Sequence, residues 1–412
     1  MPTSPGLRAD MTSWGQHIDE KFHKFGVKCQ GDGKLTEKCT SLTPLSVIVS
    51  TISTPRMLNH QTPKKTLLVA LLLLAIIFLT KPQDSGLFNQ LYYFFHPKES
   101  IQCYHTKSQT LPDISDARPA KGRSIFFHET SCNSFLNGKI TITARQACAV
   151  ESAARLNPNF EIHLLFASPG IFKFEGTQSD RFLQNLMTYP NVRIHHVDYE
   201  RYTKGTPVET LYRKGKIEVS GYAQSHASDV LRYITLWKFG GIYLDLDVIV
   251  TKPLESLPLN YAGAESDRNV AAGVLSFSPE GLGHELAQRC LQDLSENFKG
   301  YDWGYNGPGV ITRLLKKLCG AETAKEMQSK DCEGFKVFPV DAFYPIPWWD
   351  WRLYFDENLT EKVLNISKDS HVIHVWNKHS GGTRVAARGN SAYAVLAQKF
   401  CPGIVNECGY FF

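Results

Sequence analysis

Apolar positions follow two different patterns along this chain. Residues Thr66 to Thr80, TLLVALLLLAIIFLT, form one uncharged apolar run, with Lys64, Lys65 and Lys81 at its ends. From about residue 120 onward, short apolar runs alternate with longer stretches in which apolar residues recur at helical spacing. The first pattern is typical of a membrane span and the second of a globular α/β domain.

The globular part begins with a regular alternation of elements. The pattern predicts strands at Ser124–Phe127, Ile162–Phe166 and Val192–Val197, and an alanine-rich helix over 141–156. Strands that alternate with helices form a doubly wound sheet, in which ligands gather at the carboxyl ends of the strands.

One later stretch passes from a helix through two glycines into a short strand. Val230, Ile234 and Trp237 recur at helical spacing. Gly240 and Gly241 are natural helix terminators, and residues 242–244 have strand character. Asp245 and Asp247 follow at once, forming a DxD motif. Since residues i and i+2 of a strand share one face, we expect the two carboxylates to converge on a divalent cation.

A DxD motif alone is more often a surface turn than a metal site. The neighbouring residues therefore determine whether this motif is interpreted as a metal site. Asp229 and Arg232 are three residues apart on the preceding helix and share a face. They fit a clamp on a sugar and its phosphates, and they fit equally an intrahelical salt bridge.

The apolar run of 15 residues is shorter than the roughly 20 that a membrane span usually needs. A cleaved signal peptide and a buried soluble helix are the alternatives. The run lies deep in the chain and lacks an amphipathic face, so we favour an anchor, with the basic side and hence the N-terminus in the cytosol. The expected organisation is a mostly disordered tail over 1–63, a transmembrane anchor over 64–81, a stem over 82–120 and a lumenal domain over 121–412.

Cysteine usage and glycosylation sequons agree with a lumenal domain. Eight of the ten cysteines follow the apolar run, which permits complete pairing. Cys319 with Cys332 and Cys401 with Cys408 are reasonable pairs by proximity, although spacing does not fix connectivity. Asn358 begins an Asn-Leu-Thr sequon, and residues 365–367 form a second one.

The composition of the chain argues against nucleic acid as a partner. The chain has 412 residues, is 42% hydrophobic and carries a formal net charge of +5, without a Lys/Arg block interleaved with aromatic residues. Nucleic acid is therefore not an expected partner. No period of 20 to 50 residues indicates a repeat protein.

Several sequence motifs, taken in their order along the chain, resemble those of one known family. These are FFHETS, CAVESAARLNPN, SDVLRYITLWKFGGIYLDLDVIV, WGYNGPGVITRLLKK, FYPIPWWDW and HVWNKHSGGTR, between about Phe126 and Cys401. They resemble the α1,4-glycosyltransferases, the family that includes globotriaosylceramide synthase and α1,4-N-acetylglucosaminyltransferase. The resemblance implies an α/β, Rossmann-like GT-A fold behind a type II Golgi anchor. It also implies Mn²⁺ (or Mg²⁺) as cofactor, a UDP-sugar donor and retention of anomeric configuration.

The resemblance also assigns roles to residues. It implies Asp247 as the main metal ligand, Asp245 on metal or ribose, and His374 as third ligand. The remaining donor-site residues are Asp229 and Arg232 at the sugar, Lys378 and Ser380 at the diphosphate, and His128, Glu129 and Thr130 near uracil and ribose.

The acceptor side is less determined. Aromatic faces can pack on sugars, and they can equally anchor loops in the core. The candidates are Trp303, Asn306, Trp348, Trp349, Asp350 and Trp351.

The resemblance leaves the substrates open. Ala271-Ala272-Gly273 stands where the family commonly has an Asn followed by a small residue, so UDP-GalNAc is an alternative to UDP-Gal. The expected acceptor is a glycosphingolipid, and complexes with other Golgi proteins are conceivable. An α1,4-N-acetylglucosaminyltransferase acting on glycoproteins and a catalytically silent helper are the alternative functions. A phosphatase of the haloacid-dehalogenase type fits poorly, because its DxD motif opens the domain.

Overall fold

The computed structural model describes residues 100–412. The expected tail, the expected anchor and the first part of the expected stem lie outside these residues. Within the described range, no helix combines the length and apolar character that a membrane crossing requires.

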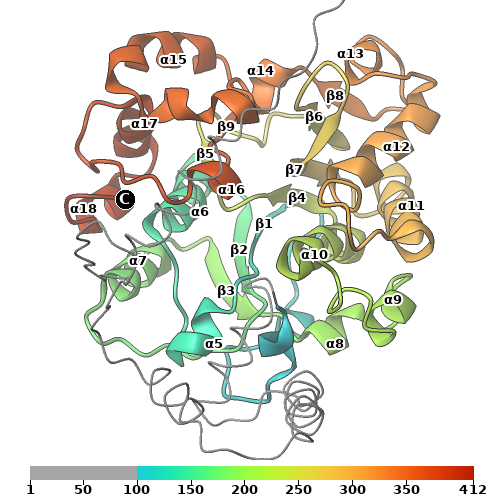
Figure 1. Ribbon diagram of the computed structural model, residues 1–412, viewed down its shortest axis with the longest axis horizontal. Coiled ribbons are helices and arrows are strands. Elements are labelled where there is room, and N and C mark those ends of the chain that lie inside the picture. Colours follow the sequence, from blue (N-terminus) through green and yellow to red (C-terminus); the bar gives the residue numbers. More distant parts are fainter. Residues whose placement is uncertain (1–99) are drawn as a thin grey trace, which may run out of the picture. The chain divides into compact units, whose positions relative to one another are not determined.

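A mixed seven-stranded sheet forms the centre of the domain, in the order β3-β2-β1-β4-β7-β6-β8 (Figure 1). The strands are β1 Ser124–Glu129, β2 Glu161–Phe166, β3 Val192–His196, β4 Gly241–Leu244, β6 Tyr261–Ala264, β7 Val270–Phe277 and β8 Lys336–Phe338. The first four are parallel to one another, as predicted, whereas β7 is antiparallel to both β4 and β6. The doubly wound expectation thus holds for only one half of the sheet.

Two further strands form a separate ribbon. β5 (Val248–Val250) pairs antiparallel with β9 (Val372–His374), and Val248 lies opposite His374. This pairing joins two segments that are far apart in the sequence.

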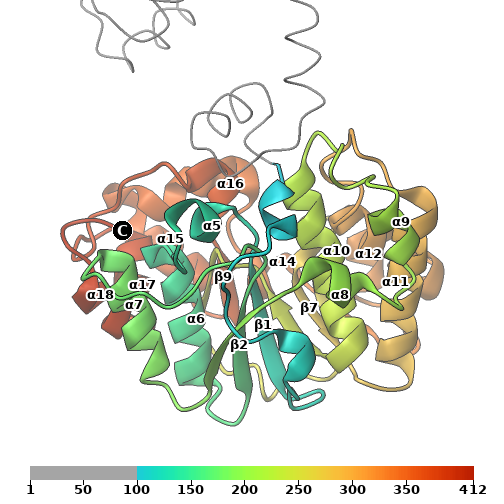
Figure 2. The same ribbon diagram turned by 90° about the horizontal axis from the view of Figure 1, so that it is seen from below.

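Helices cover both faces of the sheet (Figures 1 and 2). One apolar core includes residues of α6, α17 and α18, and the other includes residues of α10, α11 and α12. The longer helices are α6 Ala144–Leu156, α7 Gln178–Met187, α10 Ala223–Phe239, α11 Leu282–Asn297, α12 Pro308–Cys319, α15 Thr360–Ser367 and α17 Ala392–Phe400. The shorter ones are η2 Gln102–His105, η3 Ile114–Asp116, α5 Asn133–Asn137, α8 Tyr199–Thr203, α9 Glu209–Arg213, α13 Ala324–Met327, α14 Val340–Phe343, η4 Trp348–Phe355, η5 Glu357–Leu359, α16 Asn377–Ser380 and α18 Pro402–Glu407.

Local sequence accounts for the main boundaries. Helix α6 starts at Ala144 because Thr143 and Gln146 form a capping box, so the expected start at 141 was three residues early. Gly240 ends α10 with a φ of 62°, and Gly241 opens β4 with a φ of 89°. A Cβ atom on Gly241 would lie 2.4 Å from the carbonyl oxygen of Ser124, so glycine is required where β4 joins β1.

The domain begins earlier than expected. Ile101, Cys103, Leu111 and Ile114 are buried in its cores, so at least residues 101–114 of the expected stem pack as part of the domain. A disulfide from Cys103 to Cys132 fixes this segment.

The disulfides confirm one of the two suggested pairs. Cys319 bonds to Cys332 as predicted, but Cys401 bonds to Cys148 of α6 and leaves Cys408 unpaired. Helix α18 lies between residues 401 and 408, so proximity in sequence did not become proximity of the sulfur atoms. Cys290 is also a buried free thiol, so the eight cysteines are not all paired.

A buried imidazole on β2 makes the fold sensitive to acid. Burial lowers the pKa of His163 to about 4, and the carboxylate of Glu161, 3.2 Å away, opposes this only in part. The unfolded chain takes up this proton near pH 6.5, whereas the folded chain does not do so until about pH 4. The free energy of unfolding should therefore fall as the pH is lowered from 6.5 towards 4.

We predict that His163→Gln flattens this dependence. The loss of stability between pH 7 and pH 5 should be smaller than in the unmodified chain by about 2 kcal/mol, measured by denaturant unfolding at each pH. The same exchange at the exposed His379 is the control. An unchanged pH dependence in His163→Gln would contradict the assignment.

Candidate functional site

The two aspartates of the DxD motif lie in the turn between β4 and β5. Strand β4 ends at Leu244, and β5 starts only at Val248. The backbone N–H of Asp245 donates to the carbonyl of Gly273 at 2.9 Å, which holds the start of the turn beside β7. The expected strand geometry was wrong: a turn, rather than alternation along a strand, brings the two carboxylates together.

His374 completes a three-residue cluster with these aspartates. Its Nε2 atom lies 3.0 Å from Asp247 Oδ1 and 3.4 Å from Asp245 Oδ2. The β5–β9 pairing causes this, because it places His374 opposite Val248, the residue after Asp247. One potential ligand atom from each residue lies within 4.8 Å of the others. Among residues 100–412, this is the one such group of three acidic, histidine or cysteine side chains.

The negative charges of the two aspartates strongly favour a positive charge beside them. Burial disfavours the charged imidazole, but the carboxylates of Asp247 and Asp245 outweigh burial and raise the pKa of His374 to about 10. Burial alone would raise the pKa of Asp245, yet Arg232 and His374 hold it below its ordinary value. A cation at this point would supply the same positive charge.

The residues present fit a divalent metal. Two carboxylates supply hard oxygen ligands and the imidazole a borderline nitrogen ligand, a set that suits Mn²⁺ better than Mg²⁺. The buried hydroxyl of Tyr344 has no hydrogen-bond partner. Beside it, a Cβ atom on Gly273 would lie 2.6 Å from Asp245 Oδ2 and 3.2 Å from that hydroxyl. Asp245, Asp247 and His374 would hold the ion, and the glycine leaves space on the Asp245 side.

Helix α10 supplies the charged pair next to the cluster. Arg232 Nη2 lies 3.2 Å from Asp229 Oδ1, so the intrahelical salt bridge exists, and both side chains are buried. Arg232 also reaches Asp245 Oδ1 at 3.5 Å and donates to the carbonyl of Ala272 at 2.8 Å. The two alternatives from the sequence are therefore compatible: the pair is a salt bridge and borders the candidate metal site.

Asp229 occupies a tight pocket. Burial raises the pKa of Asp229 to about 7, although the guanidinium of Arg232 opposes this. A Cβ atom on Gly307 would lie 2.2 Å from Asp229 Oδ1, so glycine is required at that position. The hydroxyl of Tyr233 donates to the Gly307 carbonyl at 2.9 Å and holds the start of α12 against α10.

The loop after β9 is tied to both the cluster and helix α6. The backbone N–H of Asn377 donates to Asp247 Oδ2 at 2.7 Å. Arg145 of α6 donates through Nη1 to the Ser380 carbonyl at 2.9 Å and through Nη2 to the Thr383 carbonyl. Arg145 therefore holds the loop that in turn orients Asp247.

Ser380 and Lys378 have different positions in this loop. Ser380 is fully buried, and its hydroxyl donates to the Val375 carbonyl at 2.7 Å, so it shapes the loop instead of facing a diphosphate. Lys378 is exposed, with Nζ 5.7 Å from the ring centre of Tyr222 and 5.6 Å from that of Trp303. Of these two residues, only Lys378 has an exposed side chain.

His128, Glu129 and Thr130, at the end of β1, make different contacts. His128 is buried with Nε2 3.1 Å from the Thr235 hydroxyl of α10, and burial lowers its pKa to about 3. Burial raises the pKa of Glu129 to about 7, and its Oε2 atom has no partner. The carbonyl of Thr130 accepts from the Tyr104 hydroxyl. Glu129 keeps free capacity for a ligand, whereas His128 serves the contact with α10.

The candidate acceptor residues separate into two kinds. Trp303, Trp348, Trp349 and Asp350 are exposed, and Trp351 is half-buried. Asn306 is buried, and its amide bonds to the backbone of Lys299 at 2.8 and 3.0 Å and to His226 at 3.0 Å. Asn306 therefore fixes a loop and does not offer its amide to an acceptor.

Several residues at the site were not expected from the sequence. Tyr243 donates its hydroxyl to Asp245 Oδ1 at 2.7 Å, and Tyr344 and Arg145 have the positions given above. Glu265, just after β6, has a raised pKa because of burial, and the charge of His374 opposes this rise. Arg145 is one of three charged residues in an alanine-rich helix, with Glu151 and Arg155, so the sequence did not single it out.

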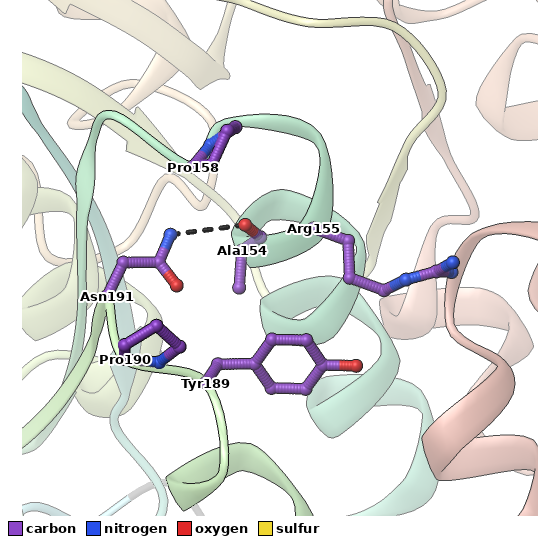
Figure 3. A pocket seen from close by; sticks show the side chains of 6 residues that line it. All are labelled: Ala154, Arg155, Pro158, Tyr189, Pro190 and Asn191. Atoms are coloured by element: carbon purple, nitrogen blue, oxygen red, sulfur yellow. Dashed lines mark hydrogen bonds between the residues drawn. The ribbon is translucent and has the colours of Figure 1, made fainter.

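A small surface pocket elsewhere does not bear on this chemistry (Figure 3). It is lined by Ala154, Arg155, Pro158, Tyr189, Pro190 and Asn191. It lies at the end of α6 and just before β3, and the Asn191 amide is bonded to three backbone carbonyls there.

The sequence matches known glycosyltransferases over most of the described range. Residues 143–264 match the glycosyltransferase sugar-binding region containing the DXD motif, and residues 279–408 match the alpha 1,4-glycosyltransferase conserved region. Human lactosylceramide 4-alpha-galactosyltransferase is 34% identical over 74% of this chain and 84% of its own length. Human alpha-1,4-N-acetylglucosaminyltransferase is 29% identical over 62% of this chain and 74% of its own length.

Solved structures give weaker likenesses. The galactosyltransferase LgtC with donor and acceptor sugar analogs has 15% identity and a TM-score of 0.35, over 69% of this chain and 95% of its own. The PaToxG glycosyltransferase has 15% identity and a TM-score of 0.34, over 71% and 90%. Assignment therefore depends on the sequence relatives and on the sheet with its DxD turn: this chain belongs to the α1,4-glycosyltransferase family.

Proposed function

We propose that this chain is a retaining α1,4-glycosyltransferase that moves galactose or N-acetylgalactosamine from a UDP-sugar to a glycosphingolipid. The observation that carries this proposal is the convergence of Asp245, Asp247 and His374 beside the Asp229–Arg232 pair. Such a site answers a specific problem: a nucleotide diphosphate is anionic, and bare carboxylates would repel it without a cation between them.

Each charged group has a role in donor binding. A bound Mn²⁺ or Mg²⁺ would neutralise the charge that grows on the departing UDP. Asp245, Asp247 and His374 would hold that ion, and the exposed Lys378 would add a positive charge beside it. Glu129, with one carboxylate oxygen unpartnered, is available to accept from the uracil or the ribose.

The arrangement favours retention by a front-face reaction. A double displacement needs a free carboxylate about 3 Å from the anomeric carbon. Asp229 and Asp245 are both within ion-pair distance of Arg232, so we assign neither of them as a nucleophile. In a front-face reaction the leaving phosphate takes the proton of the acceptor hydroxyl, and the protein has only to bind and orient both substrates.

The donor sugar depends on the wall beside Asp245. Ala271 and Ala272 of β7 pack into different apolar cores, so Gly273 is the small residue shown beside Asp245, and a Cβ atom there would crowd Asp245. The absence of a side chain at Gly273 leaves space that is compatible with the acetamido group of UDP-GalNAc. UDP-Gal is the donor that the galactosyltransferase relatives suggest.

We propose a lumenal location in the Golgi, and two features of the domain support an oxidising compartment. The domain has three disulfides, which form in oxidising compartments. The sequon residues Asn358 and Asn365 are both exposed. We propose that residues 64–81 anchor the chain as a type II membrane protein.

One alternative has direct support. The relative that is 29% identical is an α1,4-N-acetylglucosaminyltransferase, so UDP-GlcNAc belongs in any donor survey. Transfer from UDP-Gal, UDP-GalNAc and UDP-GlcNAc to a panel of glycolipid and glycoprotein acceptors distinguishes these activities. Absence of transfer to every acceptor, together with absence of donor hydrolysis, would favour the silent helper.

We predict that Asp247→Asn reduces Mn²⁺-dependent UDP-sugar hydrolysis by at least about 100-fold, because it removes one charge and one ligand from the cluster. The same exchange at the exposed Asp369, which precedes β9, is the matched control and should change the rate by less than about twofold. Full activity without a divalent metal, or in Asp247→Asn, would refute the proposed site.

We predict a different result for Arg145→Gln, because this residue acts through the loop. The Mn²⁺ concentration for half-maximal activity should rise about 10-fold, while saturating Mn²⁺ restores most of kcat. Arg145→Lys keeps the charge but not the forked hydrogen bonds, so it should resemble Arg145→Gln.

The exposed Arg155 lies on the same helix, and Arg155→Gln is the control for Arg145. An unchanged Mn²⁺ requirement in Arg145→Gln would mean that the loop does not depend on this contact. A loss of kcat that saturating Mn²⁺ does not restore would count against a positioning role through Asp247.

A further inference from the structure

Four exposed aromatic side chains border the candidate site. Tyr301 is 78% exposed, Trp303 45%, Trp348 46% and Trp349 53%. We call these four residues the aromatic rim. They include every exposed tryptophan of residues 100–412. Large aromatic residues with a polar N–H or O–H are an unusual choice for a surface that faces only water.

Contacts through Lys378 and His379 connect Trp303 to Trp348 and Trp349, and Tyr301 is placed in the rim by its position two residues before Trp303. The ring of Trp303 lies 5.6 Å from Lys378 Nζ. The next residue, His379, stacks on Trp348 with ring centres 5.4 Å apart, and Trp348 meets Trp349 edge to face at 5.5 Å. The rim is thus continuous from the loop before α12, across α16, to the start of η4.

The described chain starts on this same edge of the domain. The carbonyl of Ser100 accepts from Gln224 in the first turn of α10, at 3.2 Å. Tyr222, just before that helix, lies 5.7 Å from Lys378 Nζ. Figure 2 shows α16 and the first segment of the described chain, in blue, along one edge. The segment that leads in from the N-terminal side therefore enters beside the rim.

The length of that segment restricts how the domain can lie. Residues 81–99 separate the apolar run of residues 66–80 from Ser100. Whatever its conformation, a segment of this length reaches about 65 Å at most. A domain of the described size is about 50 Å across. If residues 64–81 lie in a bilayer, the edge opposite Ser100 could face that bilayer only with residues 81–99 close to full extension.

We propose that the aromatic rim docks on the surface of the bilayer that holds the anchor. The proposal rests on the anchor in the proposed function. Tryptophan and tyrosine prefer the interface between lipid headgroups and acyl chains, because one end of each side chain is apolar and the other is polar. Docking would bring the mouth of the site to the height at which the headgroup of a membrane lipid is presented.

This role differs from direct sugar binding by the same residues. Aromatic side chains that stack on an acceptor sugar are needed only when the acceptor is bound, and they are covered by it. Side chains that rest on lipid are immersed in the interface whether or not any substrate is present. The two roles therefore differ in what happens in vesicles without substrate.

The test uses the full chain in phosphatidylcholine vesicles, with no donor or acceptor. Tryptophan emission is measured with and without phosphatidylcholine that is brominated near the top of its acyl chains, a contact quencher. Residues 64–99 contain no tryptophan, so the anchor and the segment after it are silent, and Trp14 of the tail is replaced by Phe in every form of the chain that is compared. Vesicles replace neither substrate nor metal, so the result does not depend on which sugar is transferred.

We predict that brominated lipid quenches the unmodified chain and that the double variant Trp348→Phe/Trp349→Phe loses at least half of the quenchable emission. Trp237→Phe is the control, because Trp237 is near the far end of α10 and stacks on His284. That control should keep the quenchable emission.

Two results would overturn the proposal. One is a double variant whose quenchable emission equals that of the unmodified chain. The other is a chain that does not float with the vesicles, because the anchor is then absent. Loss of transferase activity with intact quenching would count against the proposed function alone, so the two failures are distinguishable.

Discussion

Mutual repulsion between Asp245 and Asp247 is the constraint around which this site is built. Two carboxylates in one turn, both largely removed from water, are stable only with positive charge beside them. Arg232 supplies that charge from helix α10, and His374 supplies it from strand β9. The short β5–β9 ribbon is therefore decisive, because its register delivers the imidazole to the turn. Because the positive charges of Arg232 and His374 already stabilise the two carboxylates, the same site is suited to a divalent metal ion, which carries more charge.

The surrounding elements keep this arrangement in place. Tyr243 orients Asp245, and the Asn377 N–H orients Asp247. Arg145 then fixes the loop that carries Asn377, and its guanidinium lies over the Phe355 ring at 4.8 Å. Contacts of this kind cost side-chain freedom, but they set ligand geometry before substrate arrives.

The sequence predicted the parts of this structure that depend on local pattern. Strands β1 to β4, helix α10 and the glycines after it follow from periodicity and helix-stop signals. The roles expected for Asp247 and His374 came from the family resemblance, and the structure brings both residues together. Non-local features were not predictable in the same way. The turn that replaces a strand at Asp245, the Cys148–Cys401 disulfide and the burial of Ser380 all depend on which elements meet in three dimensions.

The most direct measurement of the central claim is a crystal structure with Mn²⁺ and UDP, analysed for anomalous scattering by manganese. The account predicts one manganese peak at coordination distance from Asp245, Asp247 and His374, with the diphosphate on its open side. A manganese peak at any other group of side chains, or a UDP complex without metal between the aspartates and the diphosphate, would contradict it.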